Sequence, residues 1–207
     1  MLPAHKPDRR IERTRGAILA AFNDLVLTVG YDRISVRDII ERAGIGRSTF
    51  YEHFEDKDEV LRQSVTPVLA VLAATVADAP PPAELTVVVA HFKDNRRLLR
   101  AFFDGPPRRL LARYLAALIE ERVTMMSDTV PLVPATMVAA QLAESQLGLV
   151  QSWLEDPARA GAAAVATALV VATRAAASAL LEPSAQRACE TRRPRAASIA
   201  AETAIRR

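Results

Sequence analysis

The stretch that decides the fold is residues 34–61, ISVRDIIERAGIGRSTFYEHFEDKDEVL. Ser35 can cap a short helix, and Asp38 three positions later completes a capping-box pair. The Gly-Ile-Gly turn at 44–46 separates this helix from a second short one, expected over about residues 47–54. Two short amphipathic helices joined by so tight a turn predict a helix-turn-helix, in which the second helix is free to enter a major groove.

The second of these helices has distinct inner and outer sides. Phe50 and Phe54 are spaced i, i+4 and are expected to point inward. The outer side then carries short hydroxyls, an arginine, a tyrosine and a histidine, which suit contacts to phosphates and base edges. These outward residues are Arg47, Ser48, Thr49, Tyr51, Glu52 and His53. From periodicity alone, DNA binding and a helical hairpin with a solvated polar face are equally open.

Helical periodicity extends through the rest of the chain, so we expect an all-α fold. A first helix should run over about residues 9–29, and a long helix should open at Asp56 and be kinked or interrupted by Pro67. Asn95 and Asp156 are expected N-caps of later helices. The later helices are predicted near residues 84–94, 96–103, 107–127, 135–155 and 157–181.

Three regions follow from this pattern. Residues 1–55 are predicted to form an N-terminal arm and a three-helix, helix-turn-helix DNA-binding domain. Residues 56–182 should form a helical ligand-binding and dimerisation domain. Residues 183–207 are rich in Ala, Arg and Ser without an apolar stripe, and we expect a disordered basic tail.

Composition restricts the classes of protein. The formal net charge is only +3, but residues 1–50 carry nine Lys and Arg against six Asp and Glu, which provides the local basic surface that phosphate contact requires. The single cysteine, Cys189, excludes an intrachain disulfide and a cysteine-based zinc site. The apolar run at 162–173 falls short of the ~18 residues of a membrane span. We expect a cytoplasmic protein with no membrane association.

Sequence signatures of catalysis are missing. The chain has no glycine-rich phosphate loop, no nucleophile elbow and no His, Asp and Glu at metal-ligand spacing. We therefore expect no enzyme activity, no cofactor and no metal.

The quoted stretch resembles the DNA-binding signature of the tetracycline-repressor (TetR) family, and the resemblance covers roughly residues 9–62. The Ala-Gly turn, the Thr-aromatic-Tyr-x-His-Phe run and the Lys-Asp-Glu helix start occur together at the family's spacing. Two features depart from it: Gly46 stands where serine is frequent, and Glu52 occupies a variable position. The resemblance implies an all-helical, homodimeric repressor that leaves a palindromic double-stranded DNA operator when a small molecule binds.

The resemblance also assigns residues. Tyr51, His53 and Lys57 match positions that contact phosphates in the family. The full predicted DNA-binding set is Arg15, Ser35, Arg37, Gly46, Arg47, Ser48, Thr49, Tyr51, Glu52, His53 and Lys57.

The second half of the chain supplies candidates for a ligand pocket and a dimer interface. The run at 91–101 and the later 151–154 look like one common C-terminal type of the family. Helices 135–155 and 157–181, with Leu169 on the apolar stripe, are expected to pair with those of a second subunit. Large apolar or orienting polar side chains could enclose an unidentified small-molecule effector. They are His91, Phe92, Phe102, Phe103, Tyr114, Met125, Gln146 and Trp153.

Other interpretations stay open. Each of these side chains could instead belong to the core or to the dimer interface, which would leave a constitutive DNA-binding regulator without an effector. A helical protein-interaction module with no role in DNA binding is the third possibility.

Overall fold

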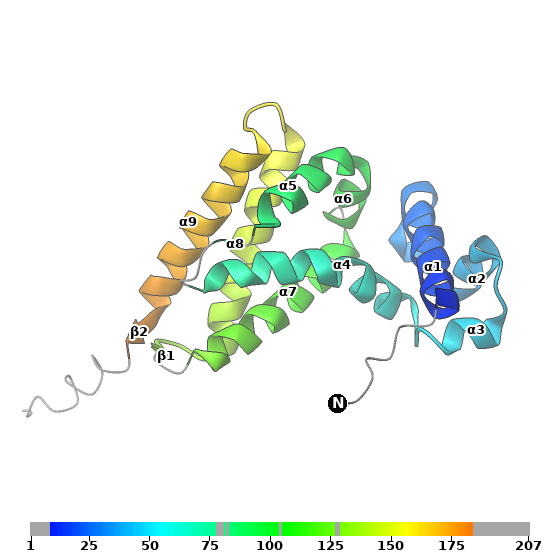
Figure 1. Ribbon diagram of the computed structural model, residues 1–207, viewed down its shortest axis with the longest axis horizontal. Coiled ribbons are helices and arrows are strands. Elements are labelled where there is room, and N and C mark those ends of the chain that lie inside the picture. The colour runs from blue at the N-terminus through cyan, green and yellow to red at the C-terminus, as the bar shows by residue number, and fades with distance from the viewer. Residues whose placement is uncertain (1–8, 78–80, 82, 104, 127–128, 184–207) are drawn as a thin grey trace, which may run out of the picture.

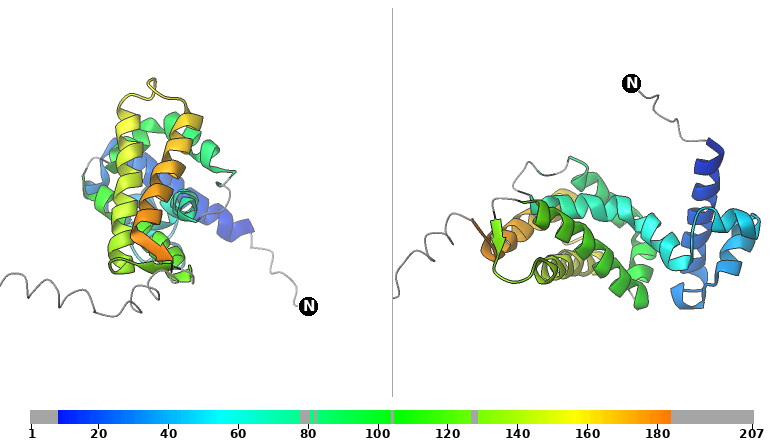
Figure 2. Two further views of the ribbon diagram at one scale, coloured as in Figure 1. Left: turned by 90° about the vertical axis from the view of Figure 1, so that its left-hand side faces the viewer. Right: turned by 90° about the horizontal axis from the view of Figure 1, so that it is seen from below.

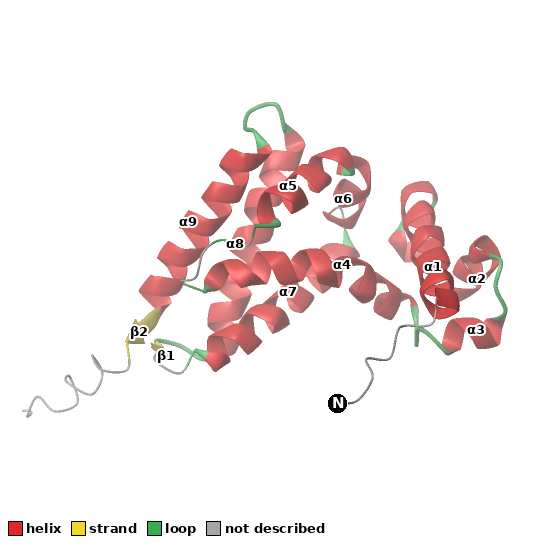
Figure 3. Cartoon of the chain, viewed as in Figure 1, coloured by secondary structure: helices red, strands yellow, loops and turns green. Residues whose placement is uncertain are grey.

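The computed structural model describes residues 9–77, 81, 83–103, 105–126 and 129–183. Over these residues the chain is almost entirely helical, which confirms the predicted all-α fold class (Figure 3). Residues 1–8 of the predicted arm and 184–207 of the predicted tail lie outside the described residues.

The N-terminal domain consists of three α-helices and a short 3₁₀ helix. The capping box predicted at Ser35 is confirmed: its side chain accepts a hydrogen bond from the Asp38 N–H, and the Asp38 side chain accepts one from the Ser35 N–H. Gly44 ends the second helix with φ at 65°, a left-handed conformation that costs glycine little because it has no Cβ. The elements are α1 (Arg9–Thr28), η1 (Tyr31–Arg33), α2 (Val36–Ala43) and α3 (Arg47–Tyr51).

Aromatic packing sets the orientation of α3. Phe50 and Phe54 are buried as predicted, with ring centroids 5.9 Å apart. The helix ends at Tyr51, three residues earlier than expected, although the Phe54 N–H still donates to the Phe50 carbonyl at 2.9 Å. One side of α3 is therefore fixed in the core, and the opposite side is left free.

The remaining helices form a larger body (Figure 1). The helix α4 leaves the N-terminal domain and runs into this body, where it packs against α7, and α7 packs against α8. The two helices α8 and α9 lie side by side as an outer layer (Figure 2). The elements are α4 (Lys57–Ala73), η2 (Ala74–Val76), α5 (Leu85–Asp94), α6 (Arg96–Phe103), α7 (Pro106–Met125), α8 (Ala135–Glu155) and α9 (Ala162–Leu180).

The beginning of α4 agrees with the sequence. The Asp56 side chain accepts a hydrogen bond from the Glu59 N–H at 2.8 Å, as an N-cap does. Pro67 lies inside the helix, which continues through it as one element. Because proline has no N–H, one hydrogen bond of the backbone ladder is missing there.

The predicted N-cap at Asp156 is wrong, whereas Asn95 directly precedes α6 as predicted, and its carbonyl accepts from the Leu99 N–H at 3.0 Å. The last helix begins at Ala162, not at 157, and the Asp156 carboxylate pairs instead with Arg159 Nε at 2.9 Å in the preceding loop. Asn95 ends α5, and its side-chain Nδ2 donates to the His91 carbonyl at 3.0 Å. The Asn95 side chain thus bonds back to α5, although its backbone begins α6.

Two short strands are an addition that the sequence did not predict. The strands β1 (Thr129–Pro131) and β2 (Leu181–Pro183) form an antiparallel pair in which Val130 lies opposite Glu182. Three residues are too few for an alternating pattern to be recognised. The pair joins the segment between α7 and α8 to the end of α9.

Two segments, Lys57–Val76 and Ala162–Leu180, are long and apolar enough to cross a membrane by length and composition. Core helices of soluble proteins pass the same test. Here α4 packs against α1, α5 and α7, and α9 packs against α5 and α8. We therefore assign both helices to the packing of the helical body.

Candidate DNA-binding face and ligand pocket

The outer side of α3 faces solvent at the end of the molecule opposite α9 (Figure 1). Arg47, Ser48, Tyr51 and Glu52 are exposed. The Arg47 guanidinium lies 5.6 Å from the centroid of the Tyr51 ring, so a cation–π contact arranges the two side chains together. This pair presents a cation and a phenol hydroxyl on one small surface, which suits contact with a polyanion.

The other predicted residues of α3 lie around this pair. Thr49 and His53 are half-buried, and Gly46 is the N-cap residue with no side chain to cap the helix. A Cβ at position 46 would lie 3.8 Å from Thr49 Oγ1 and 3.9 Å from Ser48 Oγ, which is ordinary contact. The backbone there is extended, so nothing in the packing requires glycine.

The start of α2 contributes two exposed side chains, and both already have partners. Hydrogen bonds from Ser35 hold the pKa of the Asp38 carboxyl below its ordinary value. Arg37 Nε lies 2.7 Å from Glu41 Oε1 in an exposed i, i+4 ion pair. Such a pair contributes little to stability, so Arg37 can exchange it for a phosphate at small cost.

Arg15 lies on α1, and its side chain reaches α4. It donates a hydrogen bond to the Gln63 side chain, and its guanidinium lies 5.7 Å from the centroid of the Phe54 ring. These contacts connect the N-terminal domain to α4. The Arg15 side chain nevertheless stays exposed.

A cluster that the sequence did not predict surrounds Lys57. Its Nζ donates to the carbonyl oxygens of Tyr31 and Ile34, both at 3.1 Å, and lies 4.6 Å from the centroid of the Tyr31 ring. The Tyr31 hydroxyl donates to the Asp58 carboxylate, and the Tyr114 hydroxyl of α7 donates to the Asp58 carbonyl at 3.2 Å. Burial, then the bond to Asp58, raises the pKa of the Tyr31 phenol. The cluster holds the first turn of α4 between the N-terminal domain and α7.

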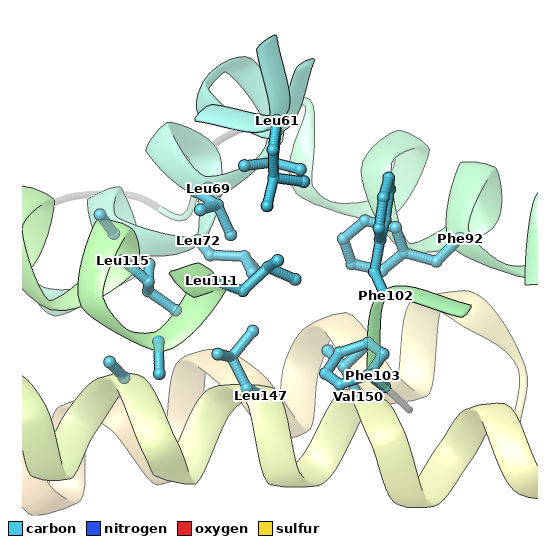
Figure 4. Close-up of a cluster of buried hydrophobic side chains, with 14 of the residues drawn as sticks. Leu61, Leu69, Leu72, Phe92, Phe102, Phe103, Leu111, Leu115, Leu147 and Val150 are labelled. Carbon is cyan, nitrogen blue, oxygen red and sulfur yellow. The ribbon is translucent and has the colours of Figure 1, made fainter. Parts of the chain in front are cut away.

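A cavity of about 130 Å³ lies inside the body next to α1. Figure 4 shows the side chains of Leu69, Phe102 and Leu147 pointing toward this region from α4, α6 and α8. Four of the predicted ligand-binding residues line the cavity. The lining consists of Asn23, Ser64, Val65, Val68, Leu69, Leu72, His91, Phe92, Leu98, Leu99, Phe102, Phe103, Leu111, Leu147 and Val150.

The other four predicted residues lie outside this cavity. Met125 is 76% exposed near the end of α7. Trp153 donates from Nε1 to the Ala160 carbonyl at 2.9 Å and so ties the α8–α9 loop to α8. Tyr114 belongs to the cluster around Asp58 described above.

Gln146, the last of the four, is buried in the body. Its Nε2 donates to Thr75 Oγ1 at 3.0 Å and to Thr173 Oγ1 at 3.1 Å. The side chain thus cross-links α8 with η2 and α9.

Two polar residues of the cavity were missed by the sequence reasoning. Ser64 Oγ donates to Asn23 Oδ1 at 3.4 Å, which joins α4 to α1. The signal was present in the sequence, since Ser64 interrupts the apolar stripe that includes Leu61 and Val68. No charged side chain lines this cavity.

The described part of the chain contains no group of three or more His, Cys, Asp or Glu side chains that could hold a metal ion.

The chain combines a helix-turn-helix whose second helix is free with a helical body that holds an apolar cavity, and one long helix, α4, joins the two. A free second helix of this kind is suited to enter a major groove of DNA. Comparisons with known proteins show what the chain's N-terminal part is similar to. The sequence profile of the tetR family of bacterial regulatory proteins matches residues 18–63. Residues 18–63, which include the helix-turn-helix and the first turns of α4, are similar to this family.

Individual relatives show where the likeness lies. YxbF, an uncharacterized HTH-type transcriptional regulator of Bacillus subtilis, is 33% identical over 100 residues, covering 48% of this chain and 26% of the relative. The dhaKLM operon transcriptional activator DhaS of Lactococcus lactis is 44% identical over 48 residues, covering 23% and 26%. The structure of a TetR-family regulator from Streptomyces coelicolor has a TM-score of 0.57 at 21% identity and covers 84% of this chain and 99% of that chain.

These similarities differ in what they support. The matches span about a quarter of the length of the two curated relatives, whereas the Streptomyces likeness supports the fold alone. Both curated relatives are named as transcriptional regulators, in agreement with the expectation that the chain is not an enzyme.

Proposed function

We propose that the chain is a cytoplasmic, homodimeric repressor that binds a palindromic double-stranded DNA operator through α3 and is released by a small molecule. The observation that carries the proposal is the position of α4. Its first turn contacts the N-terminal domain through Lys57 and Asp58, and its later turns line the apolar cavity through Val65, Val68 and Leu69. One helix therefore connects the DNA-binding face to the cavity.

The same helix explains how binding in the cavity would be coupled to DNA. A ligand that fits only one position of α4 shifts the population toward that position. Release of DNA by a hundredfold requires about 2.7 kcal/mol of differential affinity between the two states. Moving α4 would change the separation of the two α3 helices in a dimer and weaken their fit to successive major grooves.

The dimer interface is proposed on the exposed side of α8 and α9. The apolar stripe through Leu169 serves the core of its own chain, because Leu169 is only 1% exposed. Ala164, Ala168 and Ala175 lie on the opposite side of α9 and are exposed, together with Val171, which is 62% exposed. Small side chains allow two helix pairs to approach closely, and a second copy of the same surface is self-complementary.

The DNA-binding part is tested by selecting bound sequences from a random DNA pool and measuring affinity over a range of salt. Replacing Arg47 or Tyr51 with Ala should weaken binding, and loss of the Arg47 charge should lower the salt slope by about one. The matched control is Arg159→Ala, in the loop between α8 and α9. Equal affinity and slope for Arg47→Ala, Tyr51→Ala and the control would refute α3 as the DNA-binding face.

The dimer is tested by analytical ultracentrifugation at micromolar concentration. We expect a dimer that Ala168→Arg converts to a monomer, because two arginines would be forced together across the two-fold axis. The control Ala158→Arg places the same charge in the exposed loop before α9. A monomeric wild-type protein contradicts the proposed assembly.

The direction of regulation needs its own test. DhaS, which matches this chain over 48 residues, is named an activator. Placing the selected DNA site in a promoter ahead of a reporter gene separates the two cases: we expect the protein to lower expression, and raised expression would indicate an activator.

A further inference from the structure

The cavity has a wall from the N-terminal domain. Asn23 lies on α1, one residue after Phe22, whose ring stacks on Phe102 of α6 with centroids 6.4 Å apart. Ser64, from α4, donates to the Asn23 side chain across the boundary between the domain and the body. A molecule in the cavity would therefore contact α1 itself, in addition to the helices of the body.

The volume of the cavity limits the size of a ligand. Its 130 Å³ is close to the ~150 Å³ of an engineered apolar cavity that holds benzene. Pockets for drug-sized molecules usually measure about 300–1,000 Å³. The space therefore suits one ring with a small substituent.

The lining sets the charge of a ligand. Twelve of the fifteen lining residues are apolar. The three polar ones are Asn23, Ser64 and His91, and the lining contains no Lys, Arg, Asp or Glu. An ion without a charged partner would lose its hydration with no compensation, so a neutral molecule is favoured.

Among the polar side chains of the cavity, Asn23 has a hydrogen-bond donor that a ligand can use. Asn23 uses Oδ1 to accept from Ser64, and its Nδ2 has no hydrogen-bond partner among the described residues. Asn95 Nδ2 lies 3.1 Å from His91 Nδ1.

We infer that the cavity binds a neutral, single-ring molecule whose one polar oxygen accepts a hydrogen bond from Asn23 Nδ2. The inference rests on the proposed function, and it makes Asn23 the residue through which an occupied cavity displaces α1. The Ser64–Asn23 contact, at 3.4 Å, is long for a hydrogen bond between a hydroxyl and an amide oxygen. The Asn23 side chain can therefore shift toward a ligand bound at Nδ2 at little cost to this contact, which couples an occupied cavity to α1.

Calorimetric titration of the full chain with phenol, toluene and benzyltrimethylammonium tests the ligand class. Phenol and toluene should bind, and the charged ring should not. Asn23→Leu keeps the volume but removes the amide, so it should weaken phenol binding about fivefold more than toluene binding, as loss of one hydrogen bond does. Equal effects on phenol and toluene, or binding of benzyltrimethylammonium, would overturn the inference.

A second measurement needs no substitution. The sequence has two asparagines, Asn23 and Asn95, so selective ¹⁵N-asparagine labelling gives two side-chain amide signals. Phenol should shift the Asn23 signal more than toluene does, and identical shifts would overturn the inference even if Asn23→Leu fails to fold.

The effect of the ligand on regulation is tested by measuring whether phenol releases the DNA that the wild-type protein selects. Phenol should release this DNA from the wild type and from the control Thr28→Val, which removes a hydroxyl elsewhere on α1. It should not release DNA from Asn23→Leu. Release from Asn23→Leu equal to that of the wild type overturns the role of Asn23, whereas failure to select any DNA overturns the proposed function instead.

Discussion

The N-terminal domain and the helical body are built by different kinds of contact. In the domain, decisive contacts join residues close in sequence, such as the Ser35–Asp38 capping box and the Phe50–Phe54 pair. The cavity of the body is lined by residues from 23 to 150, contributed by α1 and by α4 to α8. The DNA-binding face is thus a local feature of the chain, whereas the cavity exists only after distant helices have packed.

Among the substitutions that test this comparison, Phe50→Ala should have the largest effect on stability. The buried ring anchors α3, and its removal should lower the free energy of unfolding by about 3–5 kcal/mol. Urea unfolding should show the loss, and DNA binding should fall with it. Leu27→Ala, at an exposed position of α1, should change stability by less than about 0.5 kcal/mol. An unaffected Phe50→Ala protein would mean that α3 is not held by this core.

A smaller effect is expected in the body from Gln146→Ala. The change leaves the buried hydroxyls of Thr75 and Thr173 without the Gln146 amide and should cost about 1–3 kcal/mol of unfolding free energy. Phenol binding, measured by calorimetry on the folded protein, should stay within twofold of the wild-type value. A selective loss of phenol binding with unchanged stability would instead restore Gln146 as a ligand contact.

These two regions also show how far the sequence could go. It predicted the caps at Ser35 and Asp56, the inward pair Phe50 and Phe54, and the glycine turn at Gly44, because each depends on neighbours within a few residues. Helical periodicity likewise located every long helix, although their ends moved by up to five residues.

The residues that line the cavity could not be predicted from helical periodicity. An apolar stripe indicates that a side chain is buried but not against which helix, so the sequence left open whether Leu169 faces a partner subunit or, as the structure has it, its own chain. For the same reason Trp153 was taken for a cavity residue, and Asn23 was overlooked because its partner Ser64 is 41 positions away.

The junction between the two regions gives a pH-dependent prediction. Burial and Asp58 raise the pKa of the Tyr31 phenol, so the folded state favours the neutral form more than the unfolded state does. This contribution to stability is complete below the unfolded pKa of about 10 and is lost as the pH rises above it. Tyr31→Phe should therefore make the unfolding free energy fall less steeply above about pH 10, by up to about 1.4 kcal/mol per pH unit.

Urea unfolding at several alkaline pH values checks this expectation. Tyr51→Phe, which removes an exposed hydroxyl from α3, is the control. If Tyr31→Phe keeps the wild-type slope, the Tyr31–Asp58 bond does not hold the junction in solution.

The smallest effect concerns the cap of α3. Gly46→Ser adds a hydroxyl where nothing obstructs a Cβ and should stabilise the protein by a few tenths of a kcal/mol, measured by thermal unfolding. Gly44→Ser, at φ of 65°, is the contrasting variant and should destabilise. Stabilisation by both substitutions would show that the turn is looser than its local contacts indicate.

The symmetry of the selected DNA site tests the central claim most directly, because it requires both the DNA-binding face and the dimer. Footprinting of the full chain on that site should reveal two inverted half-sites whose centres are about 34–36 Å apart, or about 10–10.5 base pairs, or a multiple of this spacing. Tyr51→Ala should weaken protection of both halves alike. A single asymmetric site protected by one subunit, or no enriched sequence at all, would contradict the account.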